Sequence, residues 1–496
     1  MELVASFGGI SSGELQRTIA HPPAGAHMVE LRADLLPPEV PLADLVRACP
    51  LPVILTLRSE DQGGRGPNDP VARRAFFQRA LSLNPALVDL EAVHDLPLLR
   101  SLIPPERALL SRHWDHTPKD LDEQAASLLS LGTRYLKLVP TARSLADVLA
   151  VLGLAHALGR GSNGQRRCVL FAQGEQGIAT RLLGPFLSAP LAYGAWERGA
   201  AVAPGQLSVG DFSALVGHLT GRPRRVFAVL GTQVQTSWSP RMHAAGYRFL
   251  GLPYAFVPLT VANEEELRTL LQPVGLGPLE AMGLNVGGFA VTMPWKEQAA
   301  SACHILAPRA QRAGAVNTVL PRPAKVVGDL TDVDGLTRVL MEAGVGLAGA
   351  AVAVLGTGGA ARAALVALQL AGSRLLLVAR HQDKGAALAA RFGARLVAPH
   401  QLKGVVAFIN ATPAGVDGEE DPLLEQVNLP PGCVVVDLPY GDRPTRLQRL
   451  AEERGWDYVS GKEVLLYQGV SQFAAMTGVA PPVTAMAAAL GLKEAQ

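Results

Sequence analysis

A lysine inside a strongly apolar run is the first residue of this sequence that demands a chemical explanation. Lys137 lies in the run Tyr135–Val139, which reads YLKLV. Burying an ammonium there is costly unless the amine is paired, neutral or used covalently. A desolvated lysine beside other cations is the setting in which an amine becomes the nucleophile that forms a Schiff base. The run therefore indicates imine chemistry on a small ketone.

Polar side chains at the ends of neighbouring apolar runs could complete such a site. His113 could move protons, because imidazole titrates near neutral pH, and Glu91 could hold it in one tautomer. Arginines could grip a substrate carboxylate with two hydrogen bonds each. An ordinary salt-bridged rim is the alternative interpretation of the same set. The residues at these run ends are Glu30, Arg32, Asp34, Arg58, Glu91 and His113.

The elements that would position these residues are short strands separated by helices. Eight apolar runs within about 220 residues are typical of a (β/α)8 barrel, although a doubly wound sheet could give a similar pattern. Strand ends meet on one face of a barrel, so the polar residues would converge there. The expected helices include Val71–Leu83, Leu121–Leu131 and Leu145–Leu158. The expected strands are Leu3–Phe7, Met28–Leu31, Val53–Leu57, Leu87–Leu90, Ala108–Leu110, Tyr135–Val139, Cys168–Ala172 and Pro190–Tyr193.

A glycine-rich turn between a strand and a helix indicates a second kind of site. The apolar run Val352–Leu355 precedes GTGGAAR, and Ala360–Ala371 has a helical composition. Gly356, Gly358 and Ala361 fit G-x-G-x-x-G/A, a pattern that lets the backbone approach a pyrophosphate at a helix N-terminus. A plain tight turn is the alternative. The strand–turn–helix context favours a dinucleotide-binding unit.

The next apolar strand, Arg374–Val378, indicates which dinucleotide is bound. An acidic residue just after such a strand would bind a ribose hydroxyl. Arg380, with Lys384 beyond it, suits a 2′-phosphate instead. The sequence therefore predicts NADP as the cofactor.

Two residues of the second half could transfer a proton beside a nicotinamide. Lys296 follows VTMPW, and Asp332 lies in GDLTDVDG. A lone lysine or aspartate in a loop is usually solvated, but a close pair could protonate a carbonyl oxygen as hydride arrives. Ser237 and Ser239, in SWSP, could cap a helix that begins near Pro240 or could bind a carboxylate.

The composition argues against several classes of function. Lys plus Arg is 45 and Asp plus Glu is 43, a net charge of +2, so nothing favours nucleic acid or an anionic membrane as a partner. The four cysteines lie far apart, without metal-ligand spacing or a disulfide framework, which fits a reducing cytoplasm. No apolar run approaches the ~18 residues of a membrane span, and the N-terminus lacks a signal-peptide pattern. We expect a cytoplasmic enzyme without a metal, and the oligomeric state stays open.

Several motifs of the first half resemble type I 3-dehydroquinate dehydratases, in that family's order and over residues 1–218. The resemblance implies a barrel in which Lys137 forms an imine with the substrate ketone. His113 would remove the adjacent proton and then assist loss of water, with support from Glu91. Substrate contacts are implied for Glu30, Arg32, Arg58, Arg181 (on the carboxylate) and Gln206 (in the closing loop). The motifs are VELRAD at 29–34, TLR at 56–58, VDLE at 88–91, SRHWDHTP at 111–118, YLKLVP at 135–140 and APGQ at 203–206.

Two residues depart from that family's usual pattern. Val202 stands where a serine usually precedes the alanine of the APGQ loop, and Thr180 stands where a serine usually precedes Arg181. Thr180 keeps a hydroxyl, whereas Val202 lacks one. We therefore expect weaker substrate binding or looser closure of the loop at Val202.

The second half resembles shikimate dehydrogenases from about Val226 to the C-terminus. The resemblance implies that Lys296 and Asp332 are the catalytic couple. The substrate contacts that it implies are Ser237, Ser239, Thr292, Asn317, Tyr440 and Gln468. The motifs are GTQVQTSWSPRMH at 231–243, VTMPWK at 291–296, AVNT at 315–318, TDVDG at 331–335, GTGGAAR at 356–362, INATPAG at 409–415, DLPY at 437–440 and SGKEVLLYQGVSQF at 460–473.

The same resemblance extends to the cofactor. The residues expected at NADP are Gly356, Gly358, Gly359, Ala360, Arg380, Lys384, Asn410, Thr412, Pro413 and Gly461. Of these, Asn410, Thr412 and Pro413 would line its nicotinamide side. Ala290 and Leu330 stand where the family usually has asparagine, and Arg380 is flanked by Ala379 and His381 rather than by Asn and Thr. Because the catalytic pair is intact we expect activity, with weaker support of Lys296 and Asp332 by neighbouring amides.

The two resemblances imply one bifunctional enzyme. Its first half would dehydrate 3-dehydroquinate to 3-dehydroshikimate, and its second would reduce that ketone to shikimate. The expected division is 1–220 for the barrel, 221–225 for a linker, 226–335 plus 465–496 for a substrate-binding lobe and 336–464 for a Rossmann-like lobe. The alternatives are a Schiff-base barrel fused to a quinate-type dehydrogenase, and a non-catalytic sensor of metabolites or NADP. A sensor has no need of proton-transfer residues.

Overall fold

The computed structural model describes residues 1–8, 15–37, 39–161, 166–272 and 276–492. The chain forms two compact units. One comprises Met1–Arg224, Pro253–Thr260 and Pro278–Asn285, and the other comprises Arg225–Leu252, Val261–Gly277 and Val286–Gln496. Among the helices in the described ranges, none combines the length and the apolarity that a membrane crossing needs.

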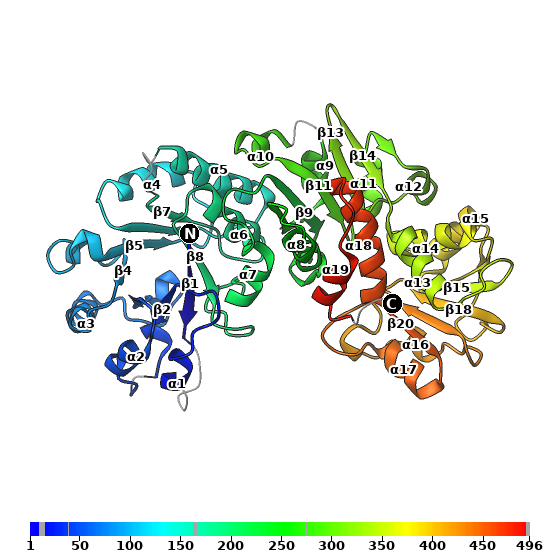
Figure 1. Ribbon diagram of the computed structural model, residues 1–496, viewed down its shortest axis with the longest axis horizontal. Coiled ribbons are helices and arrows are strands. Elements are labelled where there is room, and N and C mark those ends of the chain that lie inside the picture. The colour runs from blue at the N-terminus through cyan, green and yellow to red at the C-terminus, as the bar shows by residue number, and fades with distance from the viewer. Residues whose placement is uncertain (9–14, 38, 162–165, 273–275, 493–496) are drawn as a thin grey trace. The chain divides into compact units, whose positions relative to one another are not determined.

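Eight parallel strands in the order β7-β6-β5-β4-β3-β2-β1-β8 form the first unit, with helices on the outside (Figure 1). This confirms the barrel, in which β7 and β8 are the two ends of the hydrogen-bonded order. The strands are β1 (Glu2–Phe7), β2 (Met28–Arg32), β3 (Val53–Thr56), β4 (Leu87–Glu91), β5 (Ala108–His113), β6 (Tyr135–Val139), β7 (Cys168–Leu170) and β8 (Leu191–Ala195). The helices are α1 (Leu15–Ile19), α2 (Leu42–Ala48), α3 (Pro70–Ser82), α4 (Leu121–Leu129), α5 (Leu145–Gly161), α6 (Ile178–Leu187) and α7 (Val209–Val216).

The two-residue period of a strand explains why polar residues collect inside this barrel. Leu109 belongs to a buried apolar cluster, and Ser111 lies two residues further along β5, on the same side. The strand register pairs Ser111 with Lys137 on β6 and with Glu91 on β4. An apolar layer is thus followed, toward the carboxyl ends of the strands, by a layer of polar side chains.

A mixed sheet has the order β10-β9-β11-β13-β14-β12. The residues of β10 are counted with the first unit, and the other five strands belong to the second. Its strands are β9 (Arg225–Gly231), β10 (Tyr254–Thr260), β11 (Val286–Val291), β12 (Ile305–Leu306), β13 (Thr318–Arg322) and β14 (Lys325–Asp329). The helices around it are α8 (Ser239–Phe249), α9 (Glu264–Leu271), α10 (Gly277–Ala281), α11 (Lys296–Ala302), α12 (Pro308–Ala313) and α13 (Asp332–Glu342).

A parallel sheet in the order β17-β16-β15-β18-β19-β20 completes the second unit. Counted along the chain this order is 3-2-1-4-5-6, that of a dinucleotide-binding Rossmann sheet. It reverses between β15 and β18, so the glycine turn after β15 lies at the point where such sheets bind ligands. The strands are β15 (Ala351–Leu355), β16 (Arg374–Val378), β17 (Arg395–Leu396), β18 (Val405–Asn410), β19 (Val434–Asp437) and β20 (Asp457–Ser460). The helices are α14 (Gly359–Leu370), α15 (Gln382–Phe392), α16 (Pro422–Glu425) and α17 (Arg446–Arg454).

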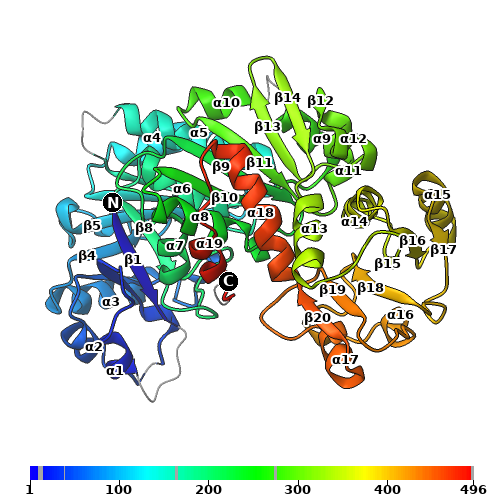
Figure 2. The same cartoon turned by 45° about the vertical axis from the view of Figure 1, so that its right-hand side comes forward.

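The last two helices return to the mixed sheet. Helix α18 (Gly461–Thr477) contacts α13, α8 and β11, and α19 (Val483–Ala489) contacts α8. In Figures 1 and 2, α18 runs beside β11 in both views. A capping box between Ser460 and Glu463 fixes the start of α18, directly after β20. The chain therefore crosses from the parallel sheet back to the mixed sheet at Gly461.

Candidate active sites

Lys137 is buried inside the barrel and paired, with 4% of its surface exposed. Its Nζ lies 2.9 Å from Glu30 Oε1, 3.5 Å from Asp89 Oδ2 and 4.0 Å from the centre of the Tyr193 ring. Burial by itself would raise the pKa of Glu30, but Lys137 and Arg32 outweigh it and lower that pKa to about 2. The lysine is therefore held between two carboxylates in a buried pocket.

Arg58 and Glu91 belong to a buried network next to Lys137. Arg58 donates to Asp89 Oδ2 at 2.6 Å, to Glu91 Oε1 at 3.0 Å and to Ser111 Oγ at 2.8 Å. Arg73 lies 3.0 Å from the other Glu91 oxygen. Nearby, Arg32 makes a two-pronged ion pair with Asp34, at 2.9 and 2.7 Å. These arginines are already neutralised by carboxylates of the chain.

His113 is half-buried at the end of β5, and the expected contact with Glu91 is not formed. Among the described residues no hydrogen bond joins the two side chains, because both Glu91 oxygens accept bonds from Ser59 and from arginines. Burial, together with the charges of Arg58 and Lys137, lowers the pKa of His113 well below its usual range. The imidazole is therefore a neutral base, and its Nε2 has no partner in the described part of the chain.

Gln62 is a neighbour of His113 that the sequence interpretation missed. Its side-chain oxygen accepts the His113 backbone N–H at 3.0 Å, and the side chain is buried. The only signal was its place four residues after Arg58 in the same loop. Gln62 therefore fixes the end of β5, from which the imidazole projects.

Arg181 differs from Arg32, Arg58 and Arg73 because no carboxylate of the described chain pairs with it. It is 5% exposed, donates to the Pro204 carbonyl at 3.2 Å and lies over the Phe171 ring at 4.4 Å. Burial lowers the pKa of Arg181 to about 10, and Glu30 offsets only part of that effect. Its Nε is buried without a partner among the described residues. A buried guanidinium in this state has a strong preference for an anion.

The loop that carries Gln206 is linked to Glu30, the partner of Lys137, through two hydrogen bonds of Ser6. Gln206 Nε2 donates to Ser6 Oγ at 3.1 Å, and Ser6 Oγ donates to Glu30 Oε2 at 2.7 Å. Gln206 Oε1 accepts the Val202 N–H at 3.0 Å. The Thr180 hydroxyl, retained at the other departure, is used within its own turn, where it donates to Gly177 O at 2.6 Å.

We expect Val202→Ser to lower the KM for 3-dehydroquinate about 2- to 10-fold, the effect of one added hydrogen bond. Position 202 is tied to Gln206 through its backbone, so a hydroxyl there would sit on the loop that reaches Ser6. Steady-state dehydratase kinetics measure the change. Val202→Ala is the control, since it removes the same methyl groups without adding a donor. A KM that is unchanged or higher in the serine variant contradicts the prediction.

The second unit contains a cavity of about 430 Å³ between its two sheets. Most residues predicted for this half lie on its wall, and they come from both sheets. Those that line it are Ser237, Ser239, Thr292, Lys296, Asn317, Asp332, Gly358, Gly359, Ala360, Tyr440, Gly461 and Gln468. A small molecule and one end of a dinucleotide could therefore meet there.

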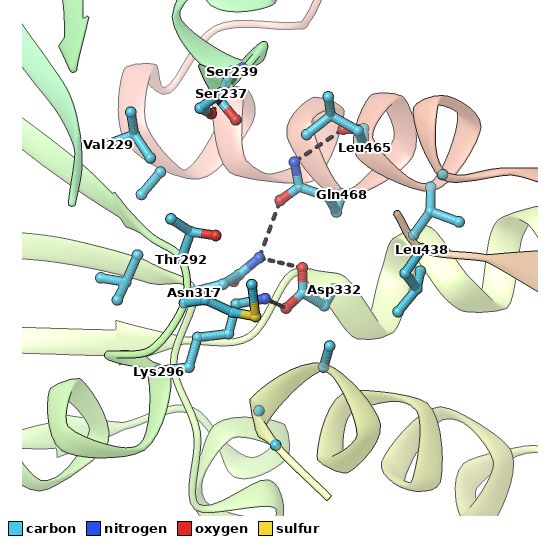
Figure 3. Close-up of a pocket in the computed structure, with 18 of the residues that line it drawn as sticks. Val229, Ser237, Ser239, Thr292, Lys296, Asn317, Asp332, Leu438, Leu465 and Gln468 are labelled. Atoms are coloured by element: carbon cyan, nitrogen blue, oxygen red, sulfur yellow. Dashed lines mark hydrogen bonds and ion pairs between the residues drawn. The ribbon is translucent and has the colours of Figure 1, made fainter. Parts of the chain in front are cut away.

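A chain of hydrogen bonds leads across this cavity to Lys296 (Figure 3). Lys296 Nζ is ion-paired with Asp332 Oδ2. The Asn317 amide donates to Asp332 Oδ1 at 2.9 Å and to Gln468 Oε1 at 3.0 Å. In Figure 3, Ser237 and Ser239 lie on the side of the cavity opposite Lys296. The cavity thus has a hydroxyl-lined end and an end that carries the Lys296–Asp332 ion pair.

Ala290 and Leu330 stand where asparagines would support the Lys296–Asp332 pair. Asn317 and Thr331 provide that support instead. Thr331 N donates to Asn317 Oδ1 at 2.7 Å, and Asn317 donates to Thr331 Oγ1 at 3.0 Å. Ala290 lies on the cavity wall, and Leu330 is fully buried. Thr331 was missed in the sequence interpretation, although it belongs to the TDVDG motif. The Lys296–Asp332 pair therefore keeps one buried amide partner.

Three glycines of this site leave no room for a side chain. Gly356 has φ +122°, and a Cβ there would lie 2.8 Å from Thr412 Cγ2. A Cβ at Gly359 would lie 2.7 Å from Lys296 Cβ, and one at Gly461 would lie 2.3 Å from the Leu438 carbonyl oxygen. The nucleotide loop therefore touches the stem of the candidate catalytic lysine.

The remaining predicted cofactor residues lie outside this cavity. Arg380 and Lys384 are exposed, and Arg380 Nη2 donates to Asp421 Oδ2 at 2.5 Å. The buried Asn410 amide donates to Asp437 Oδ1 at 2.8 Å, and the Thr412 hydroxyl donates to Asn410 Oδ1 at 2.7 Å. Asn410 thus shapes the turn after β18 from within. Pro413, which follows in that turn, is not on the cavity wall.

Fold and geometry together define a two-part enzyme, with a lysine-bearing barrel and a dinucleotide-binding dehydrogenase. Residues 10–221 match the family model for type I 3-dehydroquinase. Residues 229–319 match the shikimate dehydrogenase substrate binding domain, and residues 461–490 match the shikimate 5′-dehydrogenase C-terminal domain.

Known proteins of both kinds are similar to this chain. A chloroplastic bifunctional 3-dehydroquinate dehydratase/shikimate dehydrogenase of Arabidopsis thaliana is 28% identical over 492 residues, covering 92% of this chain and 79% of that protein. A shikimate 5-dehydrogenase structure from Thermus thermophilus is 35% identical, with 54% of this chain and 98% of that one covered and a TM-score of 0.48. The S. pombe dehydroquinate dehydratase and shikimate dehydrogenase structure is 23% identical, covers 99% of this chain and 98% of that one, and has a TM-score of 0.43.

The chain belongs to the type I 3-dehydroquinases in its first part and to the shikimate dehydrogenases in its second. It is a bifunctional enzyme, a 3-dehydroquinate dehydratase and a shikimate dehydrogenase, as the sequence motifs predicted.

Proposed function

We propose that the dehydratase reaction passes through an imine on Lys137. The amine attacks the ketone carbon of 3-dehydroquinate, and the carbonyl oxygen leaves as water. His113 then takes a proton from the adjacent carbon and delivers one to the departing hydroxyl, which leaves as a second water. Hydrolysis of the imine consumes one water and releases Lys137 with 3-dehydroshikimate. The net change is the loss of one water.

The observation that carries this proposal is the burial of Lys137 between Glu30 and Asp89, with an unpaired Arg181 in the same barrel. The carboxylates at 2.9 and 3.5 Å hold the amine in one position inside the barrel. Arg181 would bind the substrate carboxylate, because the described chain gives it no acidic partner of its own. Glu30, Arg32, Arg58 and Gln206 would complete the pocket, and Glu91 would hold Arg58 in place.

Borohydride trapping tests the imine directly. Reduction in the presence of 3-dehydroquinate should add the mass of the reduced substrate, less water, to the peptide that contains Lys137. Omitting the substrate, or replacing Lys137 with alanine, should abolish the adduct. An adduct on another lysine would overturn the assignment of Lys137.

For the dehydrogenase, we infer that Lys296 gives a proton to the carbonyl oxygen of 3-dehydroshikimate as that oxygen gains charge. Asp332 holds the Lys296 ammonium in place and accepts its proton in the reverse reaction. Asn317 and Gln468 orient Asp332 and reach the substrate hydroxyls. Ser237, Ser239, Thr292 and Tyr440 would bind the carboxylate and the remaining hydroxyl.

NADP is the cofactor that the residues of the parallel sheet fit best. The bare backbone at Gly356 lies just before α14 and that at Gly359 begins the helix, so a pyrophosphate can approach the helix N-terminus. NADPH supplies a hydride when it is bound. Gly358, Ala360 and Gly461 would lie along the bound dinucleotide, near the cavity. Arg380, with Lys384 beyond it, would hold the 2′-phosphate, and Asn410, Thr412 and Pro413 would shape the turn beside it.

Replacing Arg380 with alanine should raise the KM for NADPH about 10- to 100-fold, the worth of a charge-assisted contact to phosphate. The side chain is exposed and its hydrogen bond to Asp421 uses only Nη2, which leaves the other guanidinium nitrogens for a phosphate. The KM for NADH should change less than twofold. Lys384→Ala is the matched control, with a smaller effect. Equal losses with both dinucleotides would contradict the 2′-phosphate role.

We further propose that shikimate is preferred to quinate, which turnover with each acid would decide. Free thiols at Cys49, Cys168, Cys303 and Cys433 support a reducing compartment such as the cytoplasm. The proposed domain division remains 1–220, 221–225, 226–335 with 465–496, and 336–464.

A further inference from the structure

The side chain of Trp238, in the loop that carries the two cavity serines, contacts residues of the parallel-sheet lobe. Trp238 stands between Ser237 and Ser239 and is the N-cap residue of α8. Its ring centre lies 6.0 Å from that of Tyr440, edge-on at 67°. Lys462 Nζ lies 4.3 Å from the centre of the same indole ring. Tyr440 follows β19 and Lys462 follows β20, so two residues of the parallel-sheet lobe contact a side chain of the mixed-sheet lobe.

The contact of the Lys462 ammonium within the described residues is the one with the Trp238 ring. It is the second residue of α18, beside Gly461, and it does not line the cavity. No carboxylate of the described residues forms an ion pair with its ammonium. A cation over an indole face is attracted by the ring quadrupole, and tryptophan is the best aromatic partner for it. The charge of Lys462 therefore acts on Trp238 and not on the substrate.

The loop transmits the position of Trp238 to the serines. The Ser239 N–H donates to Ser237 Oγ at 3.3 Å, so the three consecutive residues form one small turn. Burial raises the pKa of Tyr440, and hydrogen bonds to its hydroxyl from the Trp238 backbone and the Ser237 side chain offset part of that rise. A shift of the indole would therefore move both serine hydroxyls relative to Tyr440.

We propose that Trp238, held between Tyr440 and Lys462, is a positioning residue that sets the substrate-binding geometry of Ser237 and Ser239. Lys462 is the second positioning residue, and it acts through the indole. This inference rests on the proposed role of the two serines in binding the substrate. It assigns a purpose to a tryptophan and a lysine that neither line the cavity nor take part in proton transfer.

The test compares Lys462→Met, which keeps the aliphatic stem, with Lys462→Arg, which keeps the charge. Lys462→Met should raise the KM for 3-dehydroshikimate about 3- to 10-fold, while kcat and the KM for NADPH change less than about twofold. Lys462→Arg should stay within about twofold of the parent enzyme. Trp238→Phe keeps a weaker ring and should give an intermediate KM. In a Trp238→Leu background, Lys462→Met should have no further effect.

Dehydratase activity and the KM for NADPH, measured on the same samples, establish that each variant is folded. Equal KM values for Lys462→Met and Lys462→Arg would overturn the proposal, as would independent effects of the two positions in the double variant. Ser237→Ala separates this from the proposed function. If Ser237→Ala leaves KM unchanged, the serine role itself is wrong. If Ser237→Ala raises KM but Lys462→Met does not, only the positioning role of Lys462 and Trp238 is wrong.

Discussion

Replacing Lys137 with alanine should lower dehydratase kcat by at least about 10⁴-fold, the upper end of what a single acid–base group supplies, because a covalent route is lost as well. The variant cannot form an imine, and no other lysine stands inside the described strands of the barrel. A coupled assay with 3-dehydroquinate and NADPH should then yield no shikimate. Reduction of added 3-dehydroshikimate should proceed at the parent rate.

The second unit of the same sample is the internal control for that experiment. Loss of both activities would mean that the variant is misfolded, and Lys137→Met, which keeps most of the side-chain volume, would then replace it. Removal of Lys137 also leaves Glu30 and Asp89 without their shared cation in a buried site, so some loss of stability is expected. Dehydratase turnover within tenfold of the parent by a folded variant would contradict the imine mechanism.

Replacing Lys296 with alanine should lower dehydrogenase kcat about 10²- to 10⁴-fold, the usual contribution of a positioned proton donor. The cavity keeps its serines and Gln468, so the KM for 3-dehydroshikimate should change much less than kcat. Supplied with 3-dehydroquinate and NADPH, this variant should accumulate 3-dehydroshikimate. Chromatographic measurement of the intermediate and of shikimate distinguishes it from the Lys137 variant.

Asp332→Asn is the matched companion, since it keeps the size of the side chain and its contact with Asn317 but removes the charge that holds the ammonium. It should lose less kcat than Lys296→Ala. A different outcome would contradict each of these two predictions. A large rise in KM with unchanged kcat would make Lys296 a binding residue, and a more severe loss at Asp332 would make the carboxylate the principal acid–base group.

The fold and most chemistry-bearing residues could be predicted because their signals are local. Lys137 stands in an apolar run and the glycine turn follows a strand, so neither needs knowledge of distant partners. The period of a strand also predicts which side chains share a face with Lys137. These features specify the barrel interior and the cofactor-binding turn from a few consecutive residues.

Partners of those residues could not be predicted, because they are far away in the sequence. Glu30 is 107 positions from Lys137 and pairs with it only through the register of several strands. Glu91 was expected to hold His113, but the Glu91 carboxylate forms ion pairs with Arg58 and Arg73 instead. The sequence indicates a cation at Arg380, but its bond to Asp421, 41 positions on, depends on the loop before α16.

Asn410 illustrates a different limit. Its motif pointed to the nicotinamide, yet its side chain is fully committed to Asp437, Thr412 and Ala414. A motif marks a place where a residue type is needed but does not say whether it touches the ligand or shapes the turn that does. Only the hydrogen-bond partners separate these two roles.

The contact between the position-359 backbone and the Lys296 stem constrains how this enzyme can change. Any side chain at residue 359 would press on the aliphatic stem of Lys296, the proposed proton donor, so a substitution there should lower the rate. Arg380, which we propose binds the 2′-phosphate, is exposed and pairs with Asp421 rather than with Lys296 or Asp332. On that proposal, coenzyme preference could be changed at Arg380 while the chemistry at the ketone is left intact.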